Sequence, residues 1–366
     1  MVVRHPHRLP LLALGMLALL TGLWAGLARL GWDVPLPRPG FSSLHGPLMV
    51  SGFLGTLISL ERAVALGRPW AYAAPLLTGL GGVGLIVGAP LLAAQLSMLA
   101  GSIGLVAIFA AIIRRHPALY TFTMGGGSLV WALGNLLWCL GWPVFLVVFW
   151  WAAFLVVTIA GERLELARLQ QVTGAAQATF LLLLGILLTG LLLLGWSFDG
   201  GVRLFGLGLA GLALWLGRHD IARRTVKQAG LTRFIAICLL TGYVWLGISG
   251  LSAMWFGGVP VGPQYDATLH AFFLGFVFAM IFAHAPIIFP AVLGARMAYR
   301  PLFYAHVVLL QVTLVVRLIG DAAGWSAGRQ VGGLLNAVTL LLFLVNTVSA
   351  LQSPPERAGT AQGRGA

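Results

Sequence analysis

The chain alternates long apolar runs with short polar breaks over almost its whole length. The runs hold few charged side chains, and Gly, Pro, Arg and short polar clusters separate them. An α-helix needs about 20 apolar residues to cross the hydrocarbon core of a bilayer. The pattern therefore predicts twelve membrane-spanning helices, over residues 9–30, 45–66, 70–90, 91–113, 118–140, 142–160, 173–196, 201–217, 231–256, 267–293, 300–320 and 330–351.

Composition agrees with this pattern and leaves no room for a soluble domain. Of the 366 residues, 59% are hydrophobic and only 8% are charged, which is typical of a polytopic membrane protein. The first run lacks a small-x-small cleavage site, so we interpret it as an uncleaved helix. We expect one all-α transmembrane domain over residues 1–351 and a disordered cytoplasmic tail over residues 352–366, in a multi-pass protein of the cell inner membrane.

The basic residues predict the orientation of the helices. If the N-terminus is inside, all but five of the 22 Lys and Arg residues fall in cytoplasmic segments or at the helix ends beside them. The other side holds Arg29, Arg38, Arg203, Arg317 and Arg329. Cytoplasmic loops carry the excess of basic residues in membrane proteins. Both termini are therefore expected inside, and the net charge of +13 reflects topology and attraction to membrane lipid, with no nucleic-acid partner.

Histidines at membrane depth are the first candidates for chemistry, because ionisable groups are costly there. His45 and His270 open two helices that both run inward from the outer face. His284 lies 14 residues after His270, which places it about 21 Å deeper. His306 on the following helix can reach a similar depth. The topology thus predicts an outer pair, His45 with His270, and an inner pair, His284 with His306.

Imidazole is the usual axial ligand of haem iron and a common ligand of copper. We expect the outer pair to bind a b-type haem near the outer face, with walls formed by Phe41, Phe53, Phe272 and Phe273. The inner pair is either a copper site or a proton-conducting spot, with Tyr304 and Gln311 as neighbours. An alternative stays open, in which each inner histidine bonds a backbone carbonyl freed by Pro286 or Pro290.

Twelve helices with histidines at the outer ends of helices two and ten resemble the catalytic subunit of the haem-copper oxidases. In that family these two helices supply the axial ligands of a low-spin haem. Helix ten of the family carries an H-x-H, whereas this chain reads His270-Ala271-Phe272. Helices six and seven, which hold the copper ligands of the family, contain no histidine here. The resemblance implies a haem site without the oxygen-reducing centre.

Two segments, "HGPLMVSGFLGT" from His45 and "LHAFFLGFVFAMI" from Leu269, resemble the NnrS family. These are membrane proteins related to the oxidases, described as binding haem and copper and linked to nitric oxide stress. Members usually open the first motif with His-x-His-Glu or a similar polar cluster, whereas His45 is followed here by Gly46 and Pro47. The resemblance implies a haem or haem-copper protein that handles nitric oxide or passes on electrons from a donor near the outer face.

Helices two and six both end in Glu-Arg, at Glu61-Arg62 and Glu162-Arg163. Because helices two, six and ten are four apart, the chain is consistent with a threefold internal repeat, as the oxidase resemblance implies. Glu61 and Glu162 have two interpretations. They form a proton path from the cytoplasm, or they form helix-end ion pairs with the adjacent Arg or one a turn away.

Two classes of function remain open from the sequence. The first is the haem protein described above, for which the sequence leaves catalytic turnover undecided. The second is a proton-coupled small-molecule transporter, in which intramembrane histidines bind substrate or relay protons. Pro286 and Pro290 around His284 suit the broken helices of transporters. An absorption spectrum separates the two classes, because a transporter lacks a Soret band.

Overall fold

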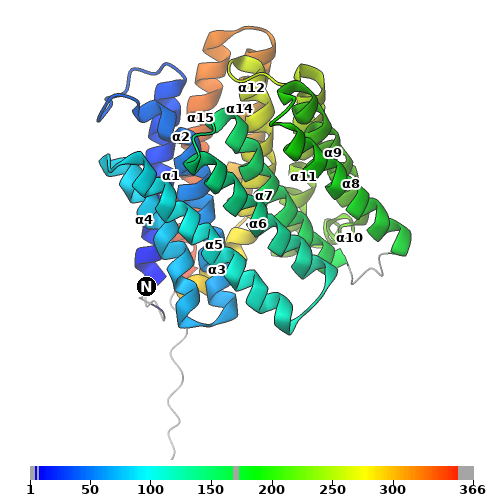
Figure 1. The fold of residues 1–366 in the computed structure, drawn as a ribbon. Coiled ribbons are helices and arrows are strands. Elements are labelled where there is room, and N and C mark those ends of the chain that lie inside the picture. Colours follow the sequence, from blue (N-terminus) through cyan, green and yellow to red (C-terminus); the bar gives the residue numbers. More distant parts are fainter. Residues whose placement is uncertain (1–4, 6–7, 168–172, 353–366) are drawn as a thin grey trace, which may run out of the picture.

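The computed structural model describes residues 5, 8–167 and 173–352 (Figure 1). Within these residues, eleven helices are long and apolar enough to cross a membrane. The further long helix α6 (Leu119–Cys139) packs between α5 and α7. The protein is therefore an all-helical, multi-pass membrane protein. Apart from Gln352, the tail predicted over residues 352–366 lies outside the described residues.

The helices begin and end within a few residues of the apolar runs. Helix two is a composite of η2 (Phe41–Leu44), α2 (His45–Pro47), η3 (Leu48–Gly55) and α3 (Thr56–Leu66), and helix ten joins α12 (Pro263–His270), η6 (Ala271–Val277) and α13 (Phe278–Leu293). The other bounds are α1 (Leu9–Arg29), η4 (Pro69–Tyr72), α4 (Ala73–Val87), α5 (Leu91–Arg115), α7 (Val144–Ala167), α8 (Gly174–Leu193), α9 (Phe198–His219), α10 (Ala222–Thr225), α11 (Gly230–Phe256), α14 (Phe303–Ala322) and α15 (Ser326–Ser349). The sixth helix, α7, runs further than the predicted 142–160, because polar residues near its end have partners inside the bundle.

Helices two, six and ten form the centre of the bundle. They are the three most buried of the eleven apolar spans. Residues of α13 contact α3, while α7 contacts both α2 and η6. The remaining helices surround them and leave large apolar side chains exposed, as a lipid-facing surface requires, among them Leu182, Leu214, Val244 and Val345. This central position agrees with the spacing of four helices in the sequence, whereas the threefold symmetry itself stays a prediction.

Both ends of the described chain lie at one end of the bundle. The Arg8 guanidinium donates to the backbone oxygens of Ala291 and Val292, each at 3.2 Å. Near the other terminus, β2 (Leu351–Gln352) pairs antiparallel with β1 (Arg296–Met297), just after α13. We call this the terminal end, and the opposite end, where α1 finishes and α12 begins, the far end. The two-residue ladder departs from the purely helical expectation, because the chain beyond α15 satisfies its backbone groups by pairing.

Helices two and ten each contain a π-helix, at η3 and η6. Each π-helix begins within three residues of a histidine, His45 in helix two and His270 in helix ten. π-Helices are rare, are mostly single turns, and occur frequently at functional sites. Gly55 and Gly275 lie in these segments, and a Cβ at either position would collide with the ring of a neighbouring tryptophan, Trp131 or Trp245.

Candidate functional site

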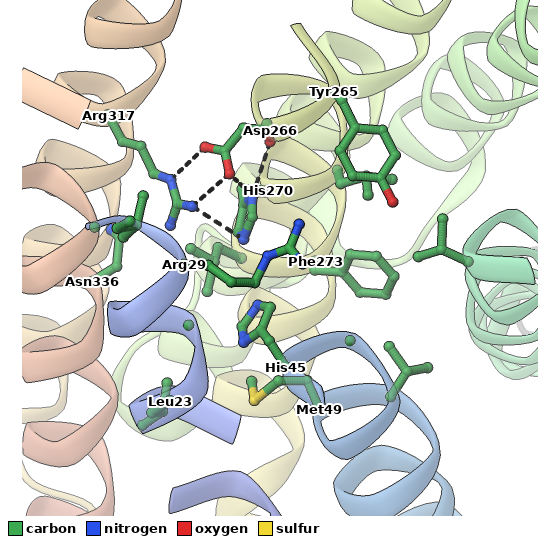
Figure 2. A pocket seen from close by; sticks show the side chains of 18 of the residues that line it. Leu23, Arg29, His45, Met49, Tyr265, Asp266, His270, Phe273, Arg317 and Asn336 are labelled. Carbon is green, nitrogen blue, oxygen red and sulfur yellow. Dashed lines mark hydrogen bonds and ion pairs between the residues drawn. The ribbon is translucent and has the colours of Figure 1, made fainter. Parts of the chain in front are cut away.

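His45 and His270 face each other at the far end of the bundle (Figure 2). Their ring centres are 6.1 Å apart and the ring planes differ by 21°. His45 is the first residue of α2, after the single turn η2, and His270 is the last residue of α12. The structure thus brings together the two histidines that the topology placed at one depth on neighbouring helices.

Both imidazoles present the same nitrogen to backbone carbonyls. His45 Nδ1 lies 2.8 Å from the carbonyl oxygen of Gly22, and His270 Nδ1 lies 2.9 Å from that of Asp266. A carbonyl oxygen can only accept, so each Nδ1 carries the proton and the lone pair lies on Nε2. This is the arrangement of metal-ligating histidines, in which an acceptor at the other ring nitrogen fixes the tautomer and the ring orientation.

The separation of the rings also suits a shared metal. A metal–nitrogen bond to imidazole is about 2.0 Å long. The centre of a five-membered ring with bonds of about 1.35 Å lies about 1.1 Å from each ring atom. Two imidazoles that shared a metal through Nε2 would hold their ring centres about 6.2 Å apart if both bonds lay in line; the ring centres here are 6.1 Å apart. Figure 2 shows the Nε2 edge of His270 turned toward His45.

A cavity of about 440 Å³ surrounds the two imidazoles, within the range of ligand pockets. In Figure 2, Phe273 and Tyr265 lie on one side of the pair and Arg317 and Asn336 on the other. The wall is mainly apolar and includes Leu23, Met49, Val148, Leu274, Phe278 and Leu340. Of the four predicted aromatic walls only Phe273 lines the cavity, because Phe41, Phe53 and Phe272 are buried against other aromatic rings.

Gly26 lets α1 pass directly against this site. A Cβ at Gly26 would lie 2.8 Å from Nδ1 and 2.9 Å from Cε1 of His45. Contacts this short require the imidazole to move. Because Gly26 follows Gly22 by one turn of α1, the same helix face supplies both the hydrogen-bond acceptor and the space for the ring.

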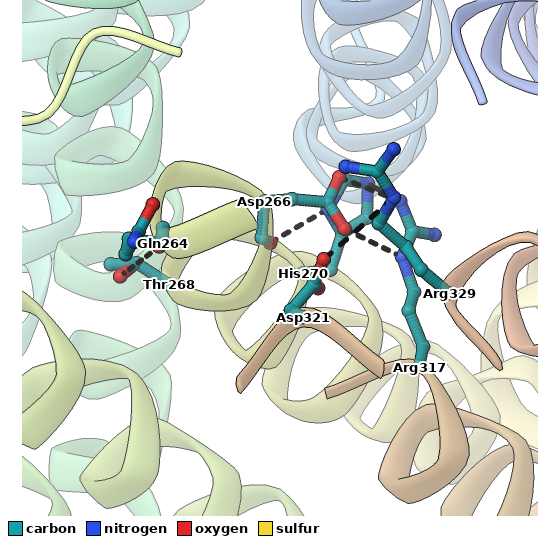
Figure 3. Close-up of polar contacts among 7 residues, drawn as sticks. All are labelled: Gln264, Asp266, Thr268, His270, Arg317, Asp321 and Arg329. Carbon is teal, nitrogen blue, oxygen red and sulfur yellow. Dashed lines mark hydrogen bonds and ion pairs between the residues drawn. The ribbon is translucent and has the colours of Figure 1, made fainter. Parts of the chain in front are cut away.

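Asp266, Arg317 and Arg329 line the cavity and belong to a cluster of charged residues (Figure 3). Arg317 Nε and one terminal nitrogen each donate to Asp266 at 2.8 Å. The same terminal nitrogen lies 3.3 Å from His270 Nε2, so this contact must open when Nε2 takes another partner. Asp321 faces Arg329 at 3.9 Å and is buried. Sequence reasoning treated these residues only as charges, and the one-turn spacing of Asp266 and His270 was the signal that it missed.

Glu61 and Glu162 take part in a second polar cluster, toward the terminal end. Arg62 on α3 hydrogen-bonds Glu162 on α7 and lies 3.4 Å from Glu61. The ion pair of Glu61 with its adjacent arginine is thus present. Glu162, in contrast, pairs across helices with Arg62, because Arg163 turns toward other partners.

Arg163 connects this cluster to the inner histidine. Its Nε lies 3.9 Å from Asp220, which also accepts from the Tyr243 hydroxyl at 2.7 Å. One terminal nitrogen of Arg163 lies 3.4 Å from His284 Nε2. Arg163 and Asp220 are buried, so the network links α7, the loop after α9, α11 and α13 inside the bundle.

The inner histidines have separate partners in the described part of the chain. His284 Nδ1 bonds the carbonyl oxygen of Met280, four residues back, at 2.7 Å. His306 lies 3.3 Å from Asn346 and packs against several phenylalanine rings, including Phe282 and Phe343. Of the predicted neighbours, Gln311 accepts from Trp245 and Tyr304 packs on Phe234. Among the described residues, no group of three or more His, Cys, Asp and Glu side chains is placed to hold a metal ion.

The carbonyl of Met280 is not one that a proline frees. Pro286 and Pro290 lack the N–H that would bond the carbonyls four positions earlier, those of Phe282 and Pro286. The hydrogen bond of His284 therefore agrees with the backbone-carbonyl alternative in kind, but at a different carbonyl.

Comparison with known proteins identifies a family and no individual relative. A family model described as "Domain of unknown function (DUF8744)" matches residues 8–352. Neither a search of the curated proteins nor a search of the solved structures found a match. The match covers all the helices described above and the far-end histidine pair.

Proposed function

The chain belongs to the DUF8744 family, a domain of unknown function, and we propose from its far-end geometry that it is a membrane haem protein. His45 and His270 hold a b-type haem through their Nε2 atoms. The observation that carries this proposal is the imidazole pair itself, with its ring centres 6.1 Å apart and both Nδ1 atoms bonded to carbonyl oxygens. Haem held by two imidazoles supplies a one-electron redox centre.

The residues around the pair fit such a group in three respects. The donor set is two neutral imidazoles, the usual axial ligands of haem iron. The cavity offers about 440 Å³ with a mainly apolar wall, which keeps water from the ligands. Arg29 and Arg329 line the same cavity, and guanidinium groups suit the carboxylates that haem carries. Arg317 would have to release His270 Nε2, from which it lies 3.3 Å, and could keep its two bonds to Asp266.

The site supports electron transfer at one face of the membrane better than it supports a reaction. A haem held by both His45 and His270 would supply one-electron chemistry and would leave its iron no position for a gas. Nitric oxide handling follows from the NnrS resemblance and needs one of the two imidazoles to leave. Copper at His284 and His306 is not part of this proposal, because the two rings have separate partners.

An absorption spectrum of the purified full-length protein tests the proposal. Cells supplied with ample haem should yield a protein with a Soret band that moves on reduction with dithionite. His45→Ala and His270→Ala should each lower the haem content or shift the band. His116→Ala is the matched control, because His116 is exposed at the end of α5, and it should keep the spectrum of the unmodified protein.

The same preparation separates the alternatives. Purified protein that contains no haem under these conditions would contradict the proposal. The proton-coupled transporter would then be the remaining interpretation. Iron and copper analysis of the same sample distinguishes haem from a bare metal ion between the imidazoles, since two nitrogen ligands in line also suit copper. A Soret band that moves when nitric oxide is added to the reduced protein would favour gas handling over electron transfer alone.

A further inference from the structure

The two histidines of the far-end pair differ in the partners of their Nδ1 atoms. Among the described residues, the hydrogen-bond partner of His45 Nδ1 is a neutral backbone carbonyl, that of Gly22 at 2.8 Å. His270 Nδ1 bonds the Asp266 carbonyl at 2.9 Å and also lies 3.1 Å from the carboxylate oxygen Oδ1 of the same residue. One N–H is therefore shared between an amide oxygen and a carboxylate. Asp266 can make both contacts because it precedes His270 by one turn of α12.

The carboxylate of Asp266 is fixed in place from the neighbouring helix α14. Arg317 donates to both carboxylate oxygens, each at 2.8 Å. Such a bidentate pair fixes the orientation of the carboxylate as well as its position. Arg317 is itself buried. Figure 3 shows Asp321 and Arg329 beside this pair, where they face each other at 3.9 Å.

A carboxylate that accepts from the N–H of a ligating imidazole fixes the ring and raises the basicity of the ligand. A more basic ligand stabilises the more highly charged, oxidised metal. The two histidines would therefore contribute unequally to the redox behaviour of a shared metal, with His270 the stronger donor.

We propose that Asp266 is a positioning residue that orients His270 and lowers the reduction potential of the haem. This inference rests on the proposed haem ligation by His45 and His270. It adds a residue that contacts neither the haem nor any substrate in the proposal. Its effect passes through the Nδ1–H of His270.

A spectroscopic redox titration of the full-length, haem-loaded protein in detergent tests this role. Asp266→Asn should raise the midpoint potential, because a neutral amide oxygen is a weaker acceptor than a carboxylate. Loss of the hydrogen-bond partner of a ligating histidine commonly weakens a metal site by about 10–100-fold. A tenfold loss confined to the oxidised state would raise the midpoint by about 59 mV for one electron.

Asp321→Asn is the matched control, because it alters a carboxyl group of the same cluster whose described ion pair is with Arg329, at 3.9 Å. A mere change of polarity in the cluster would move both variants alike. Electron paramagnetic resonance of the oxidised protein adds a second readout, since the g-values of a bis-imidazole haem follow the basicity of its ligands. Only Asp266→Asn should change them. If Asp266→Asn does not accumulate, Asp266→Glu should show a smaller shift in the same direction.

The outcomes distinguish this inference from the function on which it rests. Unmodified protein without a Soret band overturns both. A haem-loaded Asp266→Asn variant with the unmodified potential and g-values overturns the role of Asp266 and leaves the haem site standing. Equal shifts in Asp266→Asn and Asp321→Asn also overturn it, because the effect would then not depend on the contact with the imidazole.

Discussion

Gly26 sets how closely α1 approaches the imidazole of His45. A Cβ at this position would lie 2.8 Å from Nδ1 and 2.9 Å from Cε1. The ring cannot easily retreat, because its Nδ1 is bonded to Gly22 on the same helix. We expect Gly26→Ala to destabilise the protein, since overpacking costs about 1–3 kcal/mol and the gain in helix propensity returns only about 1 kcal/mol. Thermal unfolding of the purified protein in detergent measures the difference.

Gly126→Ala provides the control for this substitution. Gly126 lies on the exposed face of α6, and a Cβ there meets no atom within 4 Å. The helix-propensity gain should therefore appear alone, as an unchanged or higher melting temperature. A Gly26→Ala protein that is as stable as Gly126→Ala, with the same haem content as the unmodified chain, would contradict the close contact.

The residues of the candidate site differ in how far the sequence could predict them. The pairing of His45 with His270 could be predicted, because the distribution of basic residues indicates the topology. The topology in turn indicates the depth of each histidine in the membrane. The hydrogen-bond partner of His45 could not be predicted, since Gly22 lies 23 residues before it on another helix, whereas the partner of His270, Asp266, lies only four residues back. The Asp266–Arg317 pair spans 51 residues, and no local pattern identifies such a partner. For the inner histidines, depth along a helix did not reveal which way each ring turns.

At the scale of the helices, the Arg62–Glu162 ion pair joins α3 to α7 in the centre of the bundle. The side chains are 15% and 20% exposed, so each charge depends on its partner. Arg62→Met would leave Glu162 and the neighbouring Glu61 without their nearest cation. Breaking a buried pair from one side costs about 3–5 kcal/mol. We expect a clear fall in the melting temperature in detergent.

The double variant Arg62→Met with Glu162→Met should recover most of this loss, because replacing both charges by apolar groups is often neutral. Arg203→Met is the control at an exposed pair, that of Arg203 with Asp199 on α9, and it should lower the melting temperature much less. If the single variant at Arg62 is as stable as Arg203→Met, the pair does not hold the two helices together.

The positions of the helices could be predicted from the sequence, but the π-helical segments within helices two and ten could not. Apolar runs of spanning length fix where a helix lies in the chain, and the composite helices two and ten fill the predicted runs. The π-helices η3 and η6 use the same apolar residues as an α-helix and differ only in which carbonyl each N–H reaches. The short ladder between β1 and β2 leaves no apolar signal at all.

At the scale of the whole molecule, the polar sites are divided between the two ends of the bundle. The far end holds the histidine pair, its cavity and the Asp266–Arg317 pair. The terminal end holds both ends of the described chain and the network around Arg163. Between them lies mainly apolar core, including the stacked rings of Phe53 and Phe278. A haem at the far end would therefore exchange electrons with partners on one side of the membrane only.

The side that the far end faces can be tested with reporter fusions. The excess of basic residues at the terminal end predicts that this end is cytoplasmic. Fusions at the C-terminus and after Arg223, on the short helix α10, should make a fluorescent protein fluoresce and leave alkaline phosphatase inactive. A phosphatase fusion after Leu36, in the exposed loop that follows α1 at the far end, is the control with the opposite sign and should be active.

Phosphatase activity at the C-terminus or after Arg223 would show that the bundle has the opposite orientation in the membrane. The neighbouring positions of His45 and His270 would stand, because they are set by packing between helices and not by orientation. The haem proposal would then place its redox centre at the cytoplasmic face, and an electron partner would have to be sought there. The fusions therefore test the orientation of the bundle and leave the proposed ligation of haem by His45 and His270 unaffected.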